Sequence, residues 1–357
     1  MKILFSFFNP SGGMETLNRI RSRSLMEQGH ECHLLYTYDG EGRKNIKGIR
    51  THILTDEPSI IRLVEREHYD VIVVCTDIVL LERIKRMDTS ALLIFEIQGL
   101  GTMQTAIELL KQFDTRIRSC ADALLYPETA HLRQLLQARF PELPQFCFDN
   151  PLDTENFRYV SYPPKPYPIL GWVGRLEANK NWRDFLLLGA QLLRYRKDLY
   201  LWMFEDATLY EPSERADFEV MVRTLNLSDR LIRYSNVPHE QMADYLSMIG
   251  DSGGLLCSTS ILEGFGYAVA EALLCRCPVL ATDSDGIRRF LHHNKTGKFY
   301  TRGQLQSAYV EAVALMTDMK LRESVREQGE QIIRRSFSTK LYNDQFSRML
   351  RQLLPHL

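Results

Sequence analysis

The feature that most constrains this chain is a repeated alternation of short apolar runs with longer segments of helical period. In the first half we expect helices at residues 14–28, 59–67, 105–113 and 129–138, and strands at 3–8, 32–36, 70–75, 91–95, 123–125 and 145–148. Short apolar runs separated by helical segments are typical of βαβ units, in which a parallel sheet is covered on both faces. The first half therefore predicts a doubly wound α/β domain.

A proline-rich connector then interrupts the pattern. Residues 161–168 contain four prolines, which favours a stiff extended segment over a helix or strand. The alternation resumes after it, with strands expected at 169–173, 199–204, 254–257 and 278–281, helices at 181–195, 216–225, 241–247 and 266–274, and a helical stretch at 307–354 interrupted near Phe337. We expect two Rossmann-like domains, 1–158 and 159–340.

Composition excludes several other classes. Hydrophobic residues make up 45% and charged residues 25%, as in ordinary globular proteins, and 44 basic against 45 acidic residues give no reason to expect nucleic acid as a partner. No apolar run is long enough for a signal peptide or a membrane span. The seven cysteines lack metal-ligand spacing, and we interpret them as reduced thiols of a cytoplasmic protein, with no metal site.

The most informative motif follows the strand expected at 254–257. A loop containing Gly264 and Gly266 opens a helix there, and the N–H groups of a first helical turn attract anions. Glu263 and Glu271 flank this turn, separated by about 12 Å along a helix axis. Two carboxylates at that distance suit the two polyol ends of a ligand with a central diphosphate. The alternative is a loop-capping glutamate with a solvated one on the helix.

Two further strand-to-helix loops carry related features. Arg175 and Lys180 follow the strand at 169–173 and suit phosphate neutralisation, although two ordinary surface charges remain the alternative. Gly12 and Gly13 follow the first strand and would bring backbone N–H groups to a helix start. Taken alone, this glycine pair is a weak signal.

Together these segments resemble the retaining glycosyltransferases of family 4, which have the GT-B fold. The resemblance includes residues 121–125 before Pro127-Glu128-Thr129, and Asp149-Asn150-Pro151-Leu152-Asp153 with Phe157. It also includes Gly174-Arg175-Leu176 with Lys180, and Ser260-x-x-Glu263-Gly-Phe-Gly with Glu271, which is the most specific motif.

The resemblance implies a role for each matching residue. Arg175 and Lys180 would neutralise the leaving diphosphate. A site of this kind needs no metal and no cofactor. Glu263 would hold donor-sugar hydroxyls, and Glu271 would bind the ribose. The remaining donor-binding residues implied are Gly12, Gly13, Gly264, Phe265 and Gly266. The resemblance also implies that a C-terminal helix, 341–357, crosses back onto the first domain.

Two positions depart from the family pattern. Gln98 stands where the family usually has a histidine that reaches the donor sugar, and we place it among the catalytic residues although glutamine does not titrate. Arg289 stands where a later loop of the family carries a carboxylate. Asp283-Ser284-Asp285 mimics the metal-binding motif of another glycosyltransferase architecture, and we interpret it as a plain loop.

The resemblance therefore implies a retaining, metal-independent hexosyltransferase of polysaccharide biosynthesis. The donor expected is a nucleotide diphosphate sugar, with UDP favoured, bound by the second domain. The acceptor expected is a saccharide or a lipid-linked molecule bound by the first domain. We expect a cytoplasmic protein with at most peripheral contact at the inner membrane face. The alternative is a non-catalytic partner or sensor that binds nucleotide sugar, which the departures at Gln98 and Arg289 favour.

Overall fold

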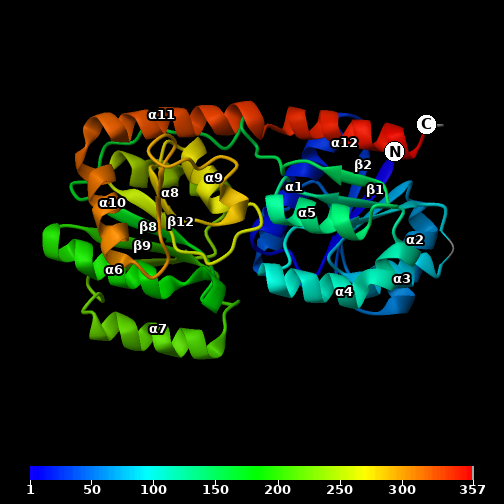
Figure 1. Ribbon diagram of the computed structural model, residues 1–357, viewed down its shortest axis with the longest axis horizontal. Helices are drawn as coiled ribbons and strands as arrows, with labels where there is room; N and C mark the ends of the chain where they lie inside the picture. The colour runs from blue at the N-terminus through cyan, green and yellow to red at the C-terminus, as the bar shows by residue number, and fades with distance from the viewer. Residues whose placement is uncertain (88, 356–357) are drawn as a thin grey trace. The chain divides into compact units, whose positions relative to one another are not determined.

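The computed structural model describes residues 1–87 and 89–355 and separates into two compact units. The first unit combines Met1–Asp153 with Phe337–Leu357, and the second is Thr154–Ser336. Each is a parallel sheet covered by helices (Figure 1). The expected fold class is confirmed: two doubly wound Rossmann-like units, with the last helix returning to the first. The final two residues of the expected segment 341–357 lie outside the described residues.

In the described part of the first unit, seven strands form one sheet in the order β3-β2-β1-β4-β5-β6-β7. Every neighbouring pair is parallel. The strands are β1 (Lys2–Phe7), β2 (Glu31–Tyr36), β3 (Arg50–Ile53), β4 (Val71–Cys75), β5 (Leu92–Glu96), β6 (Ala123–Tyr126) and β7 (Gln145–Cys147). All five residues of β4 are buried, as expected for a central strand with helices on both faces.

Helices cover both faces of this sheet. They are α1 (Gly12–Glu27), α2 (Glu57–Glu67), α3 (Ile78–Lys85), α4 (Met103–Cys120), α5 (Ala130–Arg139) and α12 (Thr339–Leu353). The apolar core on one face joins the sheet to α2 through α5, and the core on the other face includes Phe346 and Met349 of α12. Helix α12 contacts α1 (Figure 1). The Asn343 amide of α12 donates a 2.6 Å hydrogen bond to the Ser24 hydroxyl of α1.

The second unit, all of whose residues are described, contains a six-stranded parallel sheet in the order β10-β9-β8-β11-β12-β13. Its strands are β8 (Ile169–Val173), β9 (Tyr200–Glu205), β10 (Leu231–Ser235), β11 (Leu255–Ser258), β12 (Val279–Thr282) and β13 (Lys298–Tyr300). Its helices are α6 (Trp182–Tyr195), α7 (Pro212–Thr224), α8 (His239–Asp251), α9 (Tyr267–Leu274), α10 (Leu305–Thr317) and α11 (Met319–Ser336).

The chain passes between the units twice, after Asp153 and after Ser336. Leu152 donates its N–H to the carbonyl of Phe337 at 2.7 Å, and both residues belong to the first unit. The sequence places the boundaries a few residues later, after residues 158 and 340. The structure assigns 154–158 to the second unit because the buried ring of Phe157 packs against His239 of that unit.

The sequence did not predict three of the strands and one of the helices. Strands β3, β10 and β13 have only three to five residues and partly exposed or charged positions, so their alternation is weak. Helix α3 begins where the Asp77 carboxylate accepts the N–H of Leu80, directly after the apolar β4. Among the described residues, no helix combines the length and the apolar character needed to cross a membrane.

Candidate functional site

The candidate site of the second unit lies where the order of its strands reverses. Strands β8 and β11 are neighbours, but β9 and β12 follow them in opposite directions across the sheet. The loops that leave the carboxyl ends of β8 and β11 therefore diverge. In open α/β sheets ligands bind in the crevice formed at such a point. Arg175 and Lys180 lie on the first of these loops, and Glu263 lies on the second.

Hydrogen bonds join the two loops at their bases. The Asn179 amide donates to the carbonyl of Leu262 at 3.1 Å and accepts the N–H of Leu262 at 3.2 Å. The Asn179 carbonyl accepts the N–H of Ile261 at 2.8 Å. The hydroxyl of Thr259 donates to the carbonyl of Lys180 at 2.8 Å. These bonds fix Lys180 and Glu263 relative to one another.

The charged side chains of the two loops meet directly. The Lys180 ammonium Nζ lies 2.6 Å from Glu263 Oε1, and 21% and 15% of the two side chains are exposed. Arg175 is more open, with 41% of its side chain exposed, and contacts Glu177 at 3.1 Å. The two loops at the switch point thus carry two ion pairs, Lys180–Glu263 and Arg175–Glu177, each of them partly exposed.

Two close approaches of the loop before α9 require glycine, one at Gly266 in the loop and one at Gly286 beside it. Gly266 has φ = +82°, and a Cβ there would lie 2.3 Å from Ile287 Cγ2. A Cβ on Gly286 would lie 2.3 Å from the carbonyl oxygen of Glu263, so the segment at Asp285–Ile287 supports the Glu263 backbone closely. Phe265 is buried against Phe290 and does not reach out of the loop.

Glu271 is held by a residue that sequence analysis missed. Its carboxylate Oε1 lies 2.7 Å from Nε2 of His239, the first residue of α8. Both side chains are largely buried, with 10% and 15% exposed. A single histidine after a proline carries no sequence signal for this contact, because the two residues are 32 positions apart.

Comparison with known proteins matches this region to one family. Residues 153–332, half of the chain, match the family described as glycosyl transferases group 1. The chain belongs to this family. The match covers β8 through most of α11, including both loops at the switch point.

Curated relatives of this member of the group 1 family are distant. Alpha-D-kanosaminyltransferase of Streptomyces kanamyceticus is 24% identical over 52% of this chain and 46% of its own. An N-acetylgalactosaminyltransferase of Campylobacter jejuni, named for a diphospho-undecaprenol acceptor, is 24% identical over 64% of this chain and 62% of its own. The chain thus spans less than two thirds of the length of either relative.

Solved structures show the same fold across the whole chain. Anabaena Alr3699/HepE in complex with UDP-glucose has a TM-score of 0.82 at 17% identity, covering 99% of this chain and 100% of that one. Sucrose-phosphate synthase from Thermosynechococcus elongatus has a TM-score of 0.79 at 17% identity, covering 100% of both. The two Rossmann-like units of this chain therefore form a GT-B fold.

In the first unit, Gly12 and Gly13 also lie at a switch point, between β1 and β4. Gly12 has φ = +57°, and a Cβ there would meet nothing within 4 Å, so the loop is open on that side. These glycines belong to the first unit with Gln98, whereas Arg175, Lys180, Glu263 and Glu271 belong to the second.

Gln98 is committed to hydrogen bonds within the first unit. Its Nε2 donates to Glu96 Oε1 at 2.9 Å and to Asn150 Oδ1 at 3.1 Å, and its Oε1 accepts from Asn150 Nδ2 at 2.7 Å. The buried Glu96 carboxylate also accepts two hydrogen bonds from Arg21, at 2.7 and 2.9 Å. Gln98 thus cross-links the end of β5 to the segment after β7.

The Arg21–Glu96 pair is fully buried. Burial is the largest influence and lowers the pKa of the Arg21 guanidinium, but the attractions and hydrogen bonds of Glu96 and Tyr342 together raise that pKa overall. The guanidinium also lies 4.0 Å from the centroid of the Phe5 ring. This network of Arg21, Glu96, Gln98 and Asn150 anchors the carboxyl edge of β5.

The other discounted motifs have ordinary partners. Asp283 and Asp285 both pair with Arg288, at 2.7 and 2.8 Å. All seven cysteines, which lie in the described part of the chain, are free thiols, and Cys147 alone is not fully buried.

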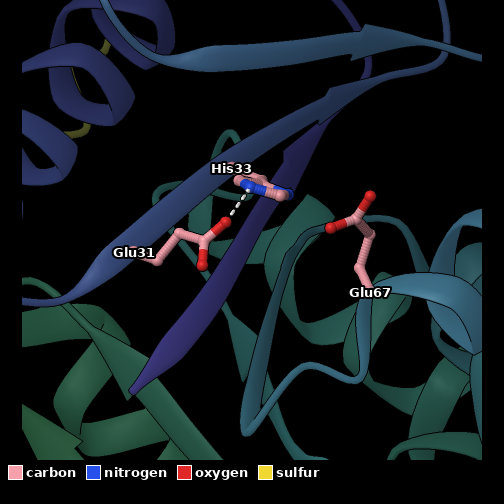
Figure 2. Close-up of side chains that lie close together, drawn as sticks. All are labelled: Glu31, His33 and Glu67. Carbon is pink, nitrogen blue, oxygen red and sulfur yellow. Dashed lines mark hydrogen bonds and ion pairs between the residues drawn. The ribbon is translucent and has the colours of Figure 1, made fainter.

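One cluster of possible metal ligands was not expected from the sequence. Single ligand atoms of Glu31, His33 and Glu67 lie within 4.8 Å of one another at the amino edge of the first sheet (Figure 2). Lys2 Nζ, however, lies 2.6 Å from Glu67 and 3.4 Å from Glu31. His33 Nδ1 already contacts the Tyr69 hydroxyl at 2.8 Å. Because the Lys2 ammonium supplies the positive charge, we interpret this set as an ion-pair cluster.

Proposed function

We propose that this chain is a retaining family 4 glycosyltransferase that moves a sugar from a nucleotide diphosphate sugar, with UDP as the favoured nucleotide. The observation that carries the proposal is the pairing of Lys180 with Glu263 across two loops at the switch point, with Arg175 on the same loop as Lys180. Opposite charges placed together in this way match a donor with an anionic diphosphate and a hydroxyl-bearing sugar.

The printed functions of relatives support this choice. The curated relatives are named for transfer of kanosamine, glucose and N-acetylgalactosamine, and one names a lipid diphosphate acceptor. A solved structure of the same fold holds UDP-glucose. We therefore propose a saccharide or a lipid-linked molecule as the acceptor for this chain.

The chemistry follows from where charge develops. As the bond from the anomeric carbon to the diphosphate breaks, negative charge grows on the leaving phosphate oxygens. Fixed cations near those oxygens lower the barrier because they interact more strongly with the transition state than with the bound donor. Arg175 and Lys180 supply two such charges, and we propose that no metal or cofactor is required.

Glu263 and Glu271 would then bind the hydroxyl-bearing ends of the donor. An ionised carboxylate accepts hydrogen bonds from several hydroxyl groups at once. Glu263 contacts Lys180, so donor binding must redistribute the Lys180 ammonium between this carboxylate and the diphosphate. The sugar and the diphosphate are therefore recognised by coupled side chains.

The test has two steps. A thermal-shift screen of UDP, GDP, ADP and their sugars should raise the unfolding midpoint for the nucleotide that binds the native state. Release of that nucleotide from its sugar should then be measured with saccharide and lipid-linked acceptors, for the wild type and for Glu263→Ala. Proton NMR of the product should show that the anomeric configuration is retained.

A second candidate is a non-catalytic sensor that binds nucleotide sugar. It is favoured by Gln98, whose amide is occupied by Asn150 and Glu96 where family 4 members usually have a titratable histidine. The sensor would give a thermal shift with nucleotide sugar but no release of nucleotide that depends on Glu263. The enzyme would show both.

A further inference from the structure

His239 reaches into the region that the motif assigns to the ribose, although it belongs to no recognised motif. Its Nε2 lies 2.7 Å from Glu271 Oε1. The contact joins the first residue of α8 to the middle of α9, within the second unit. An ionised carboxylate only accepts hydrogen bonds, so the Nε2 atom must carry the proton.

The histidine ring itself is held in place. The ring of Phe157 packs against it, with centroids 4.9 Å apart and an interplanar angle of 37°. Phe157 is buried, with 5% of its surface exposed, and precedes the proline-rich connector. A ring packed in this way has little freedom about its side-chain torsions, so the Nε2–H direction is fixed toward Glu271.

The hydrogen bond leaves half of the Glu271 carboxylate available. Among the described residues, Oε2 accepts no hydrogen bond, whereas Oε1 is engaged by His239. Glu271 is not sealed from solvent, since 10% of its side chain is exposed. A flexible glutamate would lose side-chain entropy when it bound a hydroxyl, and a glutamate already fixed by a neighbour loses less.

We propose that His239 is a positioning residue for the donor nucleotide: it fixes the Glu271 carboxylate through Oε1 so that the carboxylate is ready to accept a ribose hydroxyl. This inference rests on the proposed function, because it requires that Glu271 face the ribose. His239 acts through Glu271 and need not touch the ligand. Its effect must therefore depend on the ribose hydroxyl and on the presence of Glu271.

The test is calorimetric binding of UDP and of 2′-deoxy-UDP to the full chain. If the screen selects GDP or ADP, the corresponding ribo and deoxy pair replaces them. The variants are His239→Ala, His239→Gln, Glu271→Ala and the double variant, with His292→Ala as the matched control because its side chain is exposed in the same unit. Thermal unfolding of each variant reports whether it folds.

His239→Ala should weaken UDP binding about tenfold, the scale of one lost hydrogen bond to a charged group, and should weaken 2′-deoxy-UDP binding much less. His239→Gln, whose amide can still donate, should restore most of the preference for the ribo form. In the Glu271→Ala background, the His239→Ala change should have no further effect. His292→Ala should match the wild type.

Two outcomes would overturn the inference. One is an unchanged preference for UDP over the deoxy form in His239→Ala, whether both affinities fall equally or neither falls. The other is a full His239 effect without Glu271. If the folded wild type binds none of the nucleotides, the proposed function fails first and this inference fails with it. The behaviour of the wild type thus distinguishes the two failures.

Discussion

The Lys180 ammonium lies 2.6 Å from the Glu263 carboxylate, although the two residues are 83 positions apart. We assign these side chains to different parts of the donor, the diphosphate and the sugar. In the free protein each neutralises the other. The cation that must stabilise the leaving group is therefore held in place before the donor arrives, and little reorganisation is needed during the reaction.

Removal of either cation should slow transfer. We expect Arg175→Ala and Lys180→Ala each to lower kcat/KM by a factor that corresponds to about 2–4 kcal/mol, the scale measured for lost charge-stabilising donors. Steady-state kinetics with the donor selected by the thermal-shift screen measures this. Lys165→Ala, an exposed lysine of the proline-rich connector, is the control. Wild-type turnover in both variants would remove Arg175 and Lys180 from the site.

The two glutamates should differ in what they recognise. Glu271→Gln should weaken binding of free UDP, because the lost charge faces the ribose. Glu263→Gln should reduce discrimination among donor sugars. It should leave UDP affinity unchanged or higher, because Lys180 then has no ion pair with Glu263 to weaken when it binds the diphosphate. Calorimetry with UDP and with several UDP-sugars checks both. A crystal with nucleotide in which Glu271 points to solvent would contradict the assignment.

Gly286 should matter for turnover although it carries no side chain. A Cβ there would lie 2.3 Å from the Glu263 carbonyl oxygen and 2.5 Å from that of Gly264. Because these atoms belong to the backbone, Gly286→Ala must displace the glycine loop. We expect lower kcat/KM with the fold retained by circular dichroism. Unchanged kinetics would show that the position of this loop does not limit the reaction.

Breaking the buried Arg21–Glu96 pair should destabilise the first unit. Arg21→Leu leaves the Glu96 carboxylate buried without its main partner, which costs about 3–5 kcal/mol for pairs of this kind. Differential scanning calorimetry should show a lower Tm for the transition of this unit. The double variant Arg21→Leu, Glu96→Leu should recover part of the loss. A Tm equal to the wild type in Arg21→Leu would contradict the role of the pair.

Acid should weaken the ion-pair cluster around Lys2. The hydrogen bond from Lys2 is the main cause that lowers the pKa of Glu67 from 4.5 to about 2. A carboxyl whose pKa is lower in the folded state stabilises the fold at pH values above its pKa in the unfolded chain. This contribution disappears as the pH falls toward the folded-state pKa. The loss should therefore occur between pH 4.5 and about 2.

The measurement is Tm against pH for the wild type and for Glu67→Gln. The variant should lose stability relative to the wild type above pH 4.5 and converge with it near pH 2. Glu65→Gln, an exposed glutamate of the same helix, is the matched control. If the curves of Tm against pH for the wild type and Glu67→Gln were parallel, they would contradict the lowered pKa of Glu67.

Much of the fold could be predicted from the sequence because its determinants are local. The five apolar residues of β4 can only be a buried segment, and Gly29 with φ = +86° ends the first helical pattern. The motif loops are also local, since Arg175 and Lys180 follow one strand, and Glu263 and Gly266 follow another. Neighbouring residues set these features through hydrophobic period and backbone freedom.

The contacts that complete the site depended on tertiary structure. His239 meets Glu271 and Gln98 meets Asn150 only because parallel strands bring together the segments that follow their carboxyl ends. In the same way, Lys2 takes its place between Glu31 and Glu67 at the opposite edge of the first sheet. The sequence by itself determined the alternation, the two units and the chemical types of the motif residues. The tertiary structure decided which of them touch, since hydrogen bonds and ion pairs depend on distances that no local pattern specifies.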